Sequence, residues 1–419
     1  MAPLTAAEEH TLAQRVRDQL APTPYAVSAL AKLSGGTANF LYRGTLLQPL
    51  TGGSGTAEGT KTVVVKHSTD SVAINRDFPL DITRCDYEAT MLHALDGFPR
   101  FVTTGSGCAV EVRVPQLYHF DRETHTQILQ DFADTTDLTT MLQSPAAAVE
   151  KNLPGSGPKA VGHALGSWLR EFHDWSSMPA QRPLQAQVGP NLGMRRLKCL
   201  ITYDSFIEIL ERHPELLVEG CKDTLEEVQA TMEQEFERPP AEGDESRGLI
   251  HGDFWSGNVL LPNSRWRDAQ QSTQEEPNQL FIIDWENVQY GHRAVDIGGM
   301  LADLYERHHF SGASAGASAS LPVLEGFVEG YGGPPLLKSN DDFAFRVAVH
   351  AGVHLICWYY RRDRNAPLPY PLPTVLAALT LGRDIILKGW REDKEGLKNT
   401  FLAPVFCEGQ LGPREMGHQ

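Results

Sequence analysis

Residues 251–258 read HGDFWSGN, and residues 280–287 read LFIIDWEN. Each segment places polar side chains directly beside a run of aliphatic residues, VLLP after the first and LFII within the second. Carboxylates and amides avoid buried positions unless a partner compensates for their lost hydration. Asp253, Asn258 and Asp284 are therefore predicted to lie at a binding site beside two paired strands.

The first segment has the form H-x-D-x-x-x-x-N, which a capped turn could also explain, with Asp253 and Asn258 bonding loop amides. The rest of the chain favours phosphoryl transfer, which needs a carboxylate to orient the attacking hydroxyl and oxygen ligands for Mg²⁺. Lys66 ends the run VVVK, and Glu88 on the next predicted helix can hold it in position. With Asp284, these residues occur in the order that a kinase requires.

Each residue also has a simpler interpretation. Lys66 could be a strand-end lysine that reaches solvent, and Glu88 taken alone is more typical of a solvated helix face. The glycines of SGG at 34–36 are typical of an ordinary turn. His251 is better interpreted as a packing residue than as a base.

Composition limits the possible partners. The 419 residues include 53 acidic and 37 basic side chains, for a net charge of −16. Nucleic acid is not expected as a partner, because phosphate binding needs a basic face, whereas a cationic substrate is compatible. The six cysteines lack metal-type spacing and are interpreted as reduced thiols. With no signal-peptide pattern and no run of roughly 18 apolar residues, we expect a cytoplasmic protein without membrane contact.

The chain has two parts with different patterns. Before about residue 130, turns separate β-branched runs, and one helical segment intervenes. The predicted strands are 26–36, 39–47, 61–67, 111–121 and 124–132, with a helix at 81–96. Beyond this point helical spacing dominates, interrupted by one β element in which 248–262 pairs with 279–288. The predicted helical stretches are 161–175, 203–237 and those from 295 to about 391, including a buried helix at 345–360.

The sequence resembles the aminoglycoside phosphotransferase and choline kinase family, which are small-molecule relatives of protein kinases. The resemblance rests on HGDFWSGN, IIDWE, VVVK, RCDYE and VDIGGML. It implies an α+β, two-lobed protein-kinase-like fold with a small β-rich N-terminal lobe and a larger, mainly helical C-terminal lobe. The lobes are expected at 1–130 and 135–400, with a hinge at about 129–134 and a tail at 401–419. HGD replaces the HRD of protein kinases, and no APE element or GxGxxG loop occurs, which favours a small-molecule acceptor.

The resemblance also implies a role for each residue. Asp253 is expected to be the catalytic aspartate near the acceptor hydroxyl, with Asn258 and Asp284 as ligands of Mg²⁺. Lys66 is expected to contact the α- and β-phosphates of ATP, with Glu88 as its ion-pair partner. Further nucleotide contacts are expected from the phosphate-covering loop LSGGTANF and from the backbone of the hinge LQDF: Gly36, Thr37, Asn39, Gln130 and Phe132. Asp296 is expected to brace the catalytic loop, and His251 to be structural.

The function implied is an ATP- and Mg²⁺-dependent phosphotransferase that acts on a hydroxyl of a small molecule. The alternative is a catalytically inactive kinase-like binding or scaffold module, which would usually have lost one of these residues. No GxSxG, HExxH or Walker motif supports an unrelated enzyme fold. Aromatic residues in 353–363, with Glu286 and Asp303, would suit an amine or quaternary ammonium, although the aromatic residues are better interpreted as core packing. Aminoglycosides, choline-like alcohols, sugars and other metabolites all remain open, as does the oligomeric state.

Overall fold

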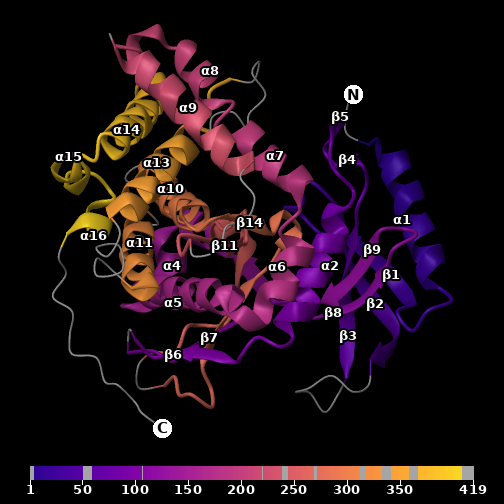
Figure 1. The fold of residues 1–419 in the computed structure, drawn as a ribbon. Helices are drawn as coiled ribbons and strands as arrows, with labels where there is room; N and C mark the ends of the chain where they lie inside the picture. The colour runs from indigo at the N-terminus through magenta and orange to yellow at the C-terminus, as the bar shows by residue number, and fades with distance from the viewer. Residues whose placement is uncertain are drawn as a thin grey trace.

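The computed structural model consists of a β-rich part at the N-terminal end and a larger helical part (Figure 1). The predicted α+β fold with unequal parts is therefore confirmed. The structure describes all residues except 1–3, 51–58, 106, 219, 238–243, 269–270, 312–316, 333–340, 358–366 and 408–419.

The N-terminal sheet has five antiparallel strands in the spatial order β1, β2, β3, β9 and β8. Their bounds are Val27–Lys32, Phe40–Leu50, Thr60–His67, Thr126–Gln130 and Leu117–Asp121, in that order. Side chains alternate between the faces of a strand, so Val63 and Val65 of β3 enter the core and Lys66 points to the other face. Helix α1 (Ala6–Leu20) covers the apolar face through residues such as Val16.

A second five-stranded sheet combines segments from both halves of the chain. Its order is β10, β12, β13, β7 and β6, with bounds Thr135–Asp137, Val259–Pro262, Asn278–Ile282, Val110–Arg113 and Phe101–Thr103. The prediction of one strand over 111–121 was wrong, because β7 and β8 lie in different sheets. Pro115 separates them, since proline has no amide hydrogen to donate to a ladder.

The predicted β element within the helical half is confirmed as two short ladders. Strand β12 pairs with β13, and β11 (Arg247–Ile250) pairs with β14 (Gln289–His292). The catalytic-loop segment HGDFWSGN connects β11 to β12, and the segment DWEN connects β13 to β14. Because each loop runs from one ladder to the other, the two loops lie side by side at the junction of the ladders. A small hairpin, β4 (Ser71–Val72) with β5 (Asn75–Pro79), completes the sheets of the N-terminal part.

Helices form most of the larger part, and helix α2 (Arg84–Leu95) packs within the smaller one. The helices before the catalytic loop are α3 Leu138–Gln143, α4 Ala146–Asn152, α5 Gly157–Ser177, α6 Arg182–Val188, α7 Leu192–Ile201, α8 Phe206–Glu211 and α9 Cys221–Glu237. Those after it are α10 Ala294–Phe310, α11 Ala317–Tyr331, α13 Asp341–Cys357, α14 Leu372–Trp390, α15 Lys394–Lys398 and α16 Ala403–Phe406. The predicted helical stretch 203–237 is broken at Pro214, where a short 3₁₀ turn separates α8 from α9.

Helices α5 and α11 pack almost backbone to backbone behind the catalytic loop. A Cβ atom added to Gly162 would lie 1.9 Å from the carbonyl oxygen of Val323, and one added to Gly166 would lie 2.0 Å from that of Phe327. Glycine permits this approach because it has no side chain. Phe254 of the catalytic loop packs against the same helices, with its ring centroid 6.2 Å from that of Phe327. The catalytic loop therefore packs on the pair of helices α5 and α11 through Phe254.

Helix α13 confirms the described part of the predicted buried helix, while residues 358–360 lie outside the described residues. Across the ranges that the structure describes, none of the helices has both the length and the apolar character needed to cross a bilayer. The lobe boundary near residue 130 stays a prediction, because β6 and β7 precede it yet pair with the C-terminal half.

Candidate active site

The catalytic loop is held by a carboxylate that accepts hydrogen bonds from its backbone. Asp296 of α10 accepts from the amides of His251 at 2.8 Å and Gly252 at 2.9 Å. Gly252 has a φ of 80°, and a Cβ atom there would lie 2.2 Å from the carbonyl oxygen of Asn287. The predicted brace role of Asp296 is thus confirmed. His173 contacts the same carboxylate at 3.2 Å, so the brace links the loop to α5.

His251 is fully buried and has the packing role expected of it. Its Nε2 lies 3.1 Å from the carbonyl oxygen of Ile283, and its ring centroid lies 4.5 Å from that of Trp285. Burial lowers the pKa of His251, despite the opposing field of Asp296. A neutral imidazole locked between two loops is a structural element, which fits the choice of Asp253 as the base.

Asp253 is the exposed carboxylate of the loop, with 26% of its side chain accessible. Its Oδ2 accepts hydrogen bonds from Trp255 Nε1 and Asn258 Nδ2, both at 3.2 Å. Its Oδ1 lies 3.7 Å from the ammonium of Lys198 on α7. The sequence analysis missed Lys198, because nothing in NLGMRRLKCL distinguishes it from its basic neighbours.

The C-terminal end of the loop is fixed by a second carboxylate, Asp303 of α10. Asp303 accepts hydrogen bonds from the amide of Ser256 at 3.1 Å and from the Ser256 hydroxyl, and it pairs with Arg307 at 3.2 Å. Only 1% of Asp303 is exposed. The expectation that Asp303 lines an acidic substrate pocket was therefore wrong, since its oxygens are occupied by the loop.

Asn258 and Asp284, the expected metal ligands, lie at the ends of the paired strands β12 and β13. The amide of Ile283 donates to the carbonyl oxygen of Asn258 at 3.0 Å, which ties the two loops together. Asp284 adopts a left-handed conformation with a φ of 66°, which is uncommon for a residue other than glycine. Such outliers often mark functional loops.

The donor set at this position fits Mg²⁺. The side-chain amide of Asn258 donates to the carbonyl oxygen and Oδ2 of Asp253, which fixes the side chain and leaves its oxygen as a ligand. Within the described parts of the chain, no three His, Cys, Asp or Glu side chains gather to hold a metal. An ion at Asn258 and Asp284 would therefore take its other ligands from water and phosphate, as Mg²⁺ usually does.

Lys66 confirms the predicted pairing with Glu88 and lies at the centre of a buried group of charges. Its ammonium is 2.8 Å from Glu88 Oε2, 2.6 Å from Asp284 Oδ1 and 3.8 Å from Glu286 Oε2. Lys66 is 3% exposed, so the interpretation as a solvent-reaching lysine is wrong. The second oxygen of Glu88 also accepts the amide of Trp285 at 3.1 Å.

The pKa values in this group reflect competition between burial and pairing. Burial opposes the charge on Lys66, but the carboxylates of Asp284 and Glu88 dominate and raise its pKa. Burial raises the pKa of Glu88 from 4.5 to about 7, against the opposing effect of Lys66. For Asp284, burial is outweighed by Lys66 and the pKa is lowered. Lys66 therefore stays charged, and Glu88 takes up a proton more readily than Asp284.

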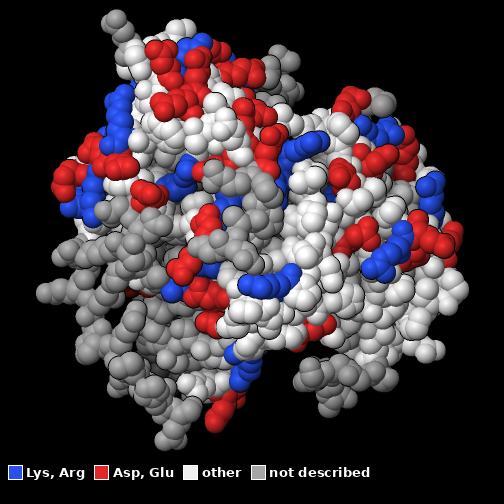
Figure 2. Space-filling view, in the orientation of Figure 1, with Lys and Arg blue, Asp and Glu red and all other residues white. Residues whose placement is uncertain are grey.

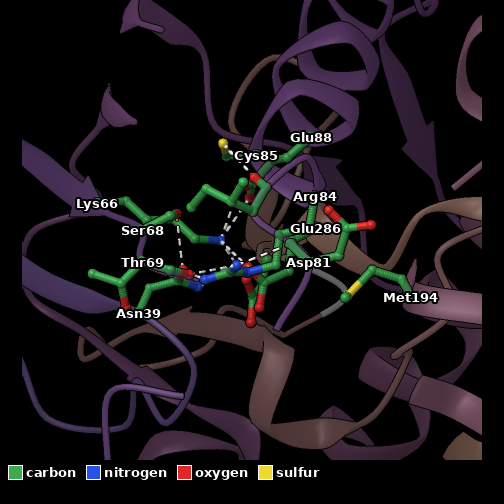
Figure 3. Close-up of polar contacts among 12 residues, drawn as sticks. Asn39, Lys66, Ser68, Thr69, Asp81, Arg84, Cys85, Glu88, Met194 and Glu286 are labelled. Atoms are coloured by element: carbon green, nitrogen blue, oxygen red, sulfur yellow. Dashed lines mark hydrogen bonds and ion pairs between the residues drawn. The ribbon is translucent and has the colours of Figure 1, made fainter. Parts of the chain in front are cut away.

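Arg84, one helical turn before Glu88, extends this group and was missed by the sequence analysis. It is 0% exposed, and its Nε donates to Glu286 at 3.0 Å while its Nη2 donates to Asn39 at 2.8 Å (Figure 3). Its remaining nitrogen donates to the carbonyl oxygen of Thr69 at 2.8 Å. We call Lys66, Arg84, Glu88, Asp284 and Glu286 the charge cluster. The i, i+4 spacing of Arg84 and Glu88 was the available signal, because it places both on one helix face.

Asn39 and Glu286 have other roles than those expected. Asn39 is buried, its amide donates to Glu286 at 2.8 Å, and its oxygen accepts from Ser68 at 2.9 Å. Its side chain is thus directed into the protein, and a nucleotide contact from this residue would have to involve the backbone. Glu286 is 3% exposed and paired with Arg84, so its expected place in a substrate pocket was wrong.

The remaining expected nucleotide contacts lie where a phosphate loop and a hinge require them, and they stay predictions. Thr37 accepts the amide of Ile74 at 3.3 Å, and a Cβ atom at Gly36 would meet the side chain of Leu41 at 2.8 Å. The amide of Gln130 donates to the carbonyl oxygen of Gln116 at 2.8 Å. The expected hinge residue Phe132 stacks on Phe281 with ring centroids 3.8 Å apart.

This fold and this order of polar residues define the class of the protein, a phosphotransferase of the small-molecule kinase type. A model of the "Phosphotransferase enzyme family" matches residues 50–335, and the chain belongs to that family. It is 30% identical over 411 residues to Phosphotransferase FrzJ of Cladobotryum sp, which covers 96% of this chain and 98% of the relative. It is 22% identical to the 4-hydroxytryptamine kinase of Psilocybe cubensis, over 79% of this chain and 80% of that one.

Among solved structures, the choline kinase LicA from Streptococcus pneumoniae overlaps with a TM-score of 0.45 at 12% identity. The overlap covers 91% of this chain and 99% of the other.

Proposed function

We propose that this phosphotransferase uses ATP and Mg²⁺ and transfers the γ-phosphoryl group to a hydroxyl of a small molecule. One observation carries the proposal. The carboxylates of Glu88 and Asp284, which come from distant parts of the sequence, both lie within hydrogen-bond distance of the Lys66 ammonium. Phosphoryl transfer depends on positioning and charge stabilisation, and this group supplies both.

Each group then has a distinct task. Asp253 would orient the acceptor hydroxyl and accept its proton, with its Oδ2 held by Trp255 and Asn258. Lys66 would contact the phosphates of the nucleotide, and Asn258 with Asp284 would hold the metal. Bound Mg²⁺ supplies neutralisation of the charge on the phosphate oxygens.

An inactive binding module is the second candidate, and the site argues against it. Such proteins typically lack the lysine, the catalytic aspartate or a metal ligand, whereas here Lys66, Asp253, Asn258 and Asp284 are all present. The side chain of Asp253 is also accessible, with 26% of it exposed. An accessible carboxylate is what an acceptor hydroxyl requires.

For the acceptor, we propose a hydroxyl compound that also carries an amine. A groove of about 910 Å³ runs along α7, the helix that carries Lys198, and its lining holds four acidic residues, Asp81, Asp204, Glu233 and Glu237, against two basic ones, Arg195 and Arg196. Figure 2 shows acidic side chains gathered over the neighbouring helices α8 and α9. The 4-hydroxytryptamine kinase relatives are named for a substrate of this chemistry. A negative groove attracts cationic ligands and repels anionic ones.

The test begins with calorimetry of ATP in the presence and absence of Mg²⁺. Millimolar ATP·Mg²⁺ that does not bind would exclude the kinase function, and Lys66→Ala should weaken nucleotide binding. A thermal-shift screen of hydroxylated compounds with ATP·Mg²⁺ present then identifies acceptors, since a ligand of the folded state raises the melting temperature. Sugars that stabilise the protein while hydroxylated amines do not would contradict the proposed acceptor class.

A further inference from the structure

Lys198 is a buried lysine beside the reacting carboxylate. It is 5% exposed, and its ammonium lies 3.7 Å from Oδ1 of Asp253. Lysine is seldom fully buried unless a charge or ligand compensates for its lost hydration. The carboxylate of Asp253 is a charge of this kind, so the burial of Lys198 is linked to the reacting group itself.

The helix that carries Lys198 is anchored to the segment after the metal-binding aspartate. Asn191 caps α7, and its side-chain amide donates to the carbonyl oxygens of Glu286 at 3.1 Å and Val288 at 2.9 Å. Farther along, Arg195 donates to the carbonyl oxygen of Tyr290 at 3.0 Å. Both anchors fix α7 against the loop that carries Asp284, so the ammonium of Lys198 is placed with respect to both loops of the site.

The two oxygens of Asp253 have different surroundings. Oδ2 accepts from Trp255 and Asn258, while Oδ1 faces Lys198. A separation of 3.7 Å exceeds a normal N–H···O hydrogen bond of about 2.7–3.2 Å. An oxygen atom placed beside Oδ1 can therefore contact both Asp253 and the ammonium of Lys198.

We propose that Lys198 is a catalytic residue whose ammonium contacts the phosphoryl group during transfer. This inference rests on the proposed function. In the reaction, the acceptor oxygen forms a bond to the γ-phosphorus as the bond from that phosphorus to the β–γ bridging oxygen breaks. ADP leaves with the bonding electrons, and the hydroxyl proton passes to Asp253. Lys198 stabilises the negative charge on the phosphoryl oxygens at the acceptor side.

A positive charge beside Asp253 also weakens that carboxylate as a base, so the two effects must be weighed. The transition state of phosphoryl transfer is loose and the proton moves late, so a modest decrease in the basicity of Asp253 costs little, although a carboxylate that orients the hydroxyl and accepts its proton is still needed. Charge stabilisation at the transferring group is worth about 10²–10³-fold per group removed. Lys66 is assigned to the nucleotide side, where it lies beside Glu88 and Asp284, whereas Lys198 lies beside Asp253 on the acceptor side. The favourable effect should therefore dominate.

The test compares Lys198→Met with a matched control, Lys222→Met. Lys222 lies on α9 with 47% of its side chain exposed, and its substitution changes the net charge equally. Calorimetry measures the affinity for Mg²⁺·ADP with and without aluminium fluoride, an analogue of the phosphoryl group in the transition state. This measurement does not require a known acceptor. We expect Lys198→Met to lose about 10²-fold of the tightening by aluminium fluoride, with ADP affinity nearly unchanged. Lys222→Met should resemble the wild type.

The outcomes separate the inference from the proposed function. A wild type that fails to bind Mg²⁺·ADP overturns the proposed function and this inference with it. A wild type that binds Mg²⁺·ADP, but shows no tightening or the same tightening as Lys198→Met, overturns only the role of Lys198. Should Lys198→Met fail to fold, Lys198→Arg keeps the charge while widening the group. It should retain part of the tightening, and a complete loss with an unchanged melting temperature would contradict the proposal.

Discussion

The charge cluster and the catalytic loop hold their carboxylates through different partners. In the charge cluster, carboxylates meet side-chain cations that come from strand β3 and helix α2, and three acids surround two cations. In the catalytic loop, Asp296 and Asp303 accept hydrogen bonds from backbone amides, and Asp303 pairs in addition with Arg307 of its own helix.

The difference bears on what each region can do. Side-chain ion pairs can exchange partners when a ligand arrives, and Lys66 has several oxygens within reach. Backbone amides cannot move without moving the chain, so Asp296 fixes the shape of the loop. We infer that the charge cluster is the adjustable side of the site and that the loop is the rigid side. Preorganised dipoles and adaptable charges are both useful in phosphoryl transfer.

The same substitution on the two sides should have different consequences. Asp253→Asn keeps the shape of the loop but removes proton acceptance, so kcat should fall by about 10²–10⁴-fold with little change in ATP affinity. Asp284→Asn should weaken the binding of Mg²⁺ and nucleotide together. Steady-state kinetics with an identified acceptor and calorimetry with ATP·Mg²⁺ measure both. Full activity of Asp253→Asn would show that the base role is wrong, and loss of ATP binding would move Asp253 to the metal side.

Removing the buried arginine should cost the most stability. Arg84→Met leaves Glu286 without its nearest cation, and breaking a buried pair costs about 3–5 kcal/mol in the free energy of unfolding. Urea denaturation measures this, with Arg122→Met as the control, because Arg122 pairs with Asp86 while 70% of its side chain is exposed. The double variant Arg84→Met with Glu286→Met should recover most of the loss. A double variant as unstable as the single one would show that Arg84 acts mainly through Asn39 and Thr69.

The loop brace should be worth less. Asp296→Asn replaces one of the two oxygens that accept from the amides of His251 and Gly252 by an amide NH₂ donor, so about 1–3 kcal/mol of unfolding free energy should be lost. Activity should fall as well, because the loop positions Asp253. Asp18→Asn, at an exposed position of α1, is the control. Unchanged stability of Asp296→Asn would mean that the loop keeps its shape without the brace.

The smallest effects should be on the pH dependence of stability, and they should have opposite signs. The pKa of Glu88 is raised from 4.5 to about 7, so the folded state binds more protons than the unfolded state in this interval. The contribution of Glu88 to the free energy of unfolding therefore decreases as pH rises through it. The pKa of Asp296 is lowered from 3.8, mainly because His173 and the loop amides outweigh burial, so its contribution is lost as pH falls below about 4.

Urea denaturation across pH tests both signs in the nucleotide-free protein. Relative to wild type, Glu88→Gln should gain stability as pH rises from 4.5 to 7. The free energy of unfolding of Asp296→Asn should decrease less steeply than that of wild type as pH falls below about 4. Parallel curves for Glu88→Gln and wild type would mean that Lys66 cancels the effect of burial and leaves the pKa of Glu88 unshifted.

Much of the site followed from local pattern. The polar residues at the ends of the aliphatic runs, and their order along the chain, predicted Asp253, Asn258 and Asp284 together with the Lys66 and Glu88 pair. The paired β element and most helices also followed from periodicity. These features depend on short segments, where burial and hydrogen bonding impose a regular spacing.

What the sequence by itself determined was therefore the set of segments and the residues at their ends. Only the tertiary structure decided that Arg84 pairs with Glu286, 202 residues away, that Asn39 turns inward, and that Lys198 faces Asp253. It also decided that β7 joins β13 while β8 remains in the first sheet. The physical reason is that a charged side chain shows no periodicity of its own. Its partner is selected by the packing of distant elements, which brings opposite charges together where water is excluded.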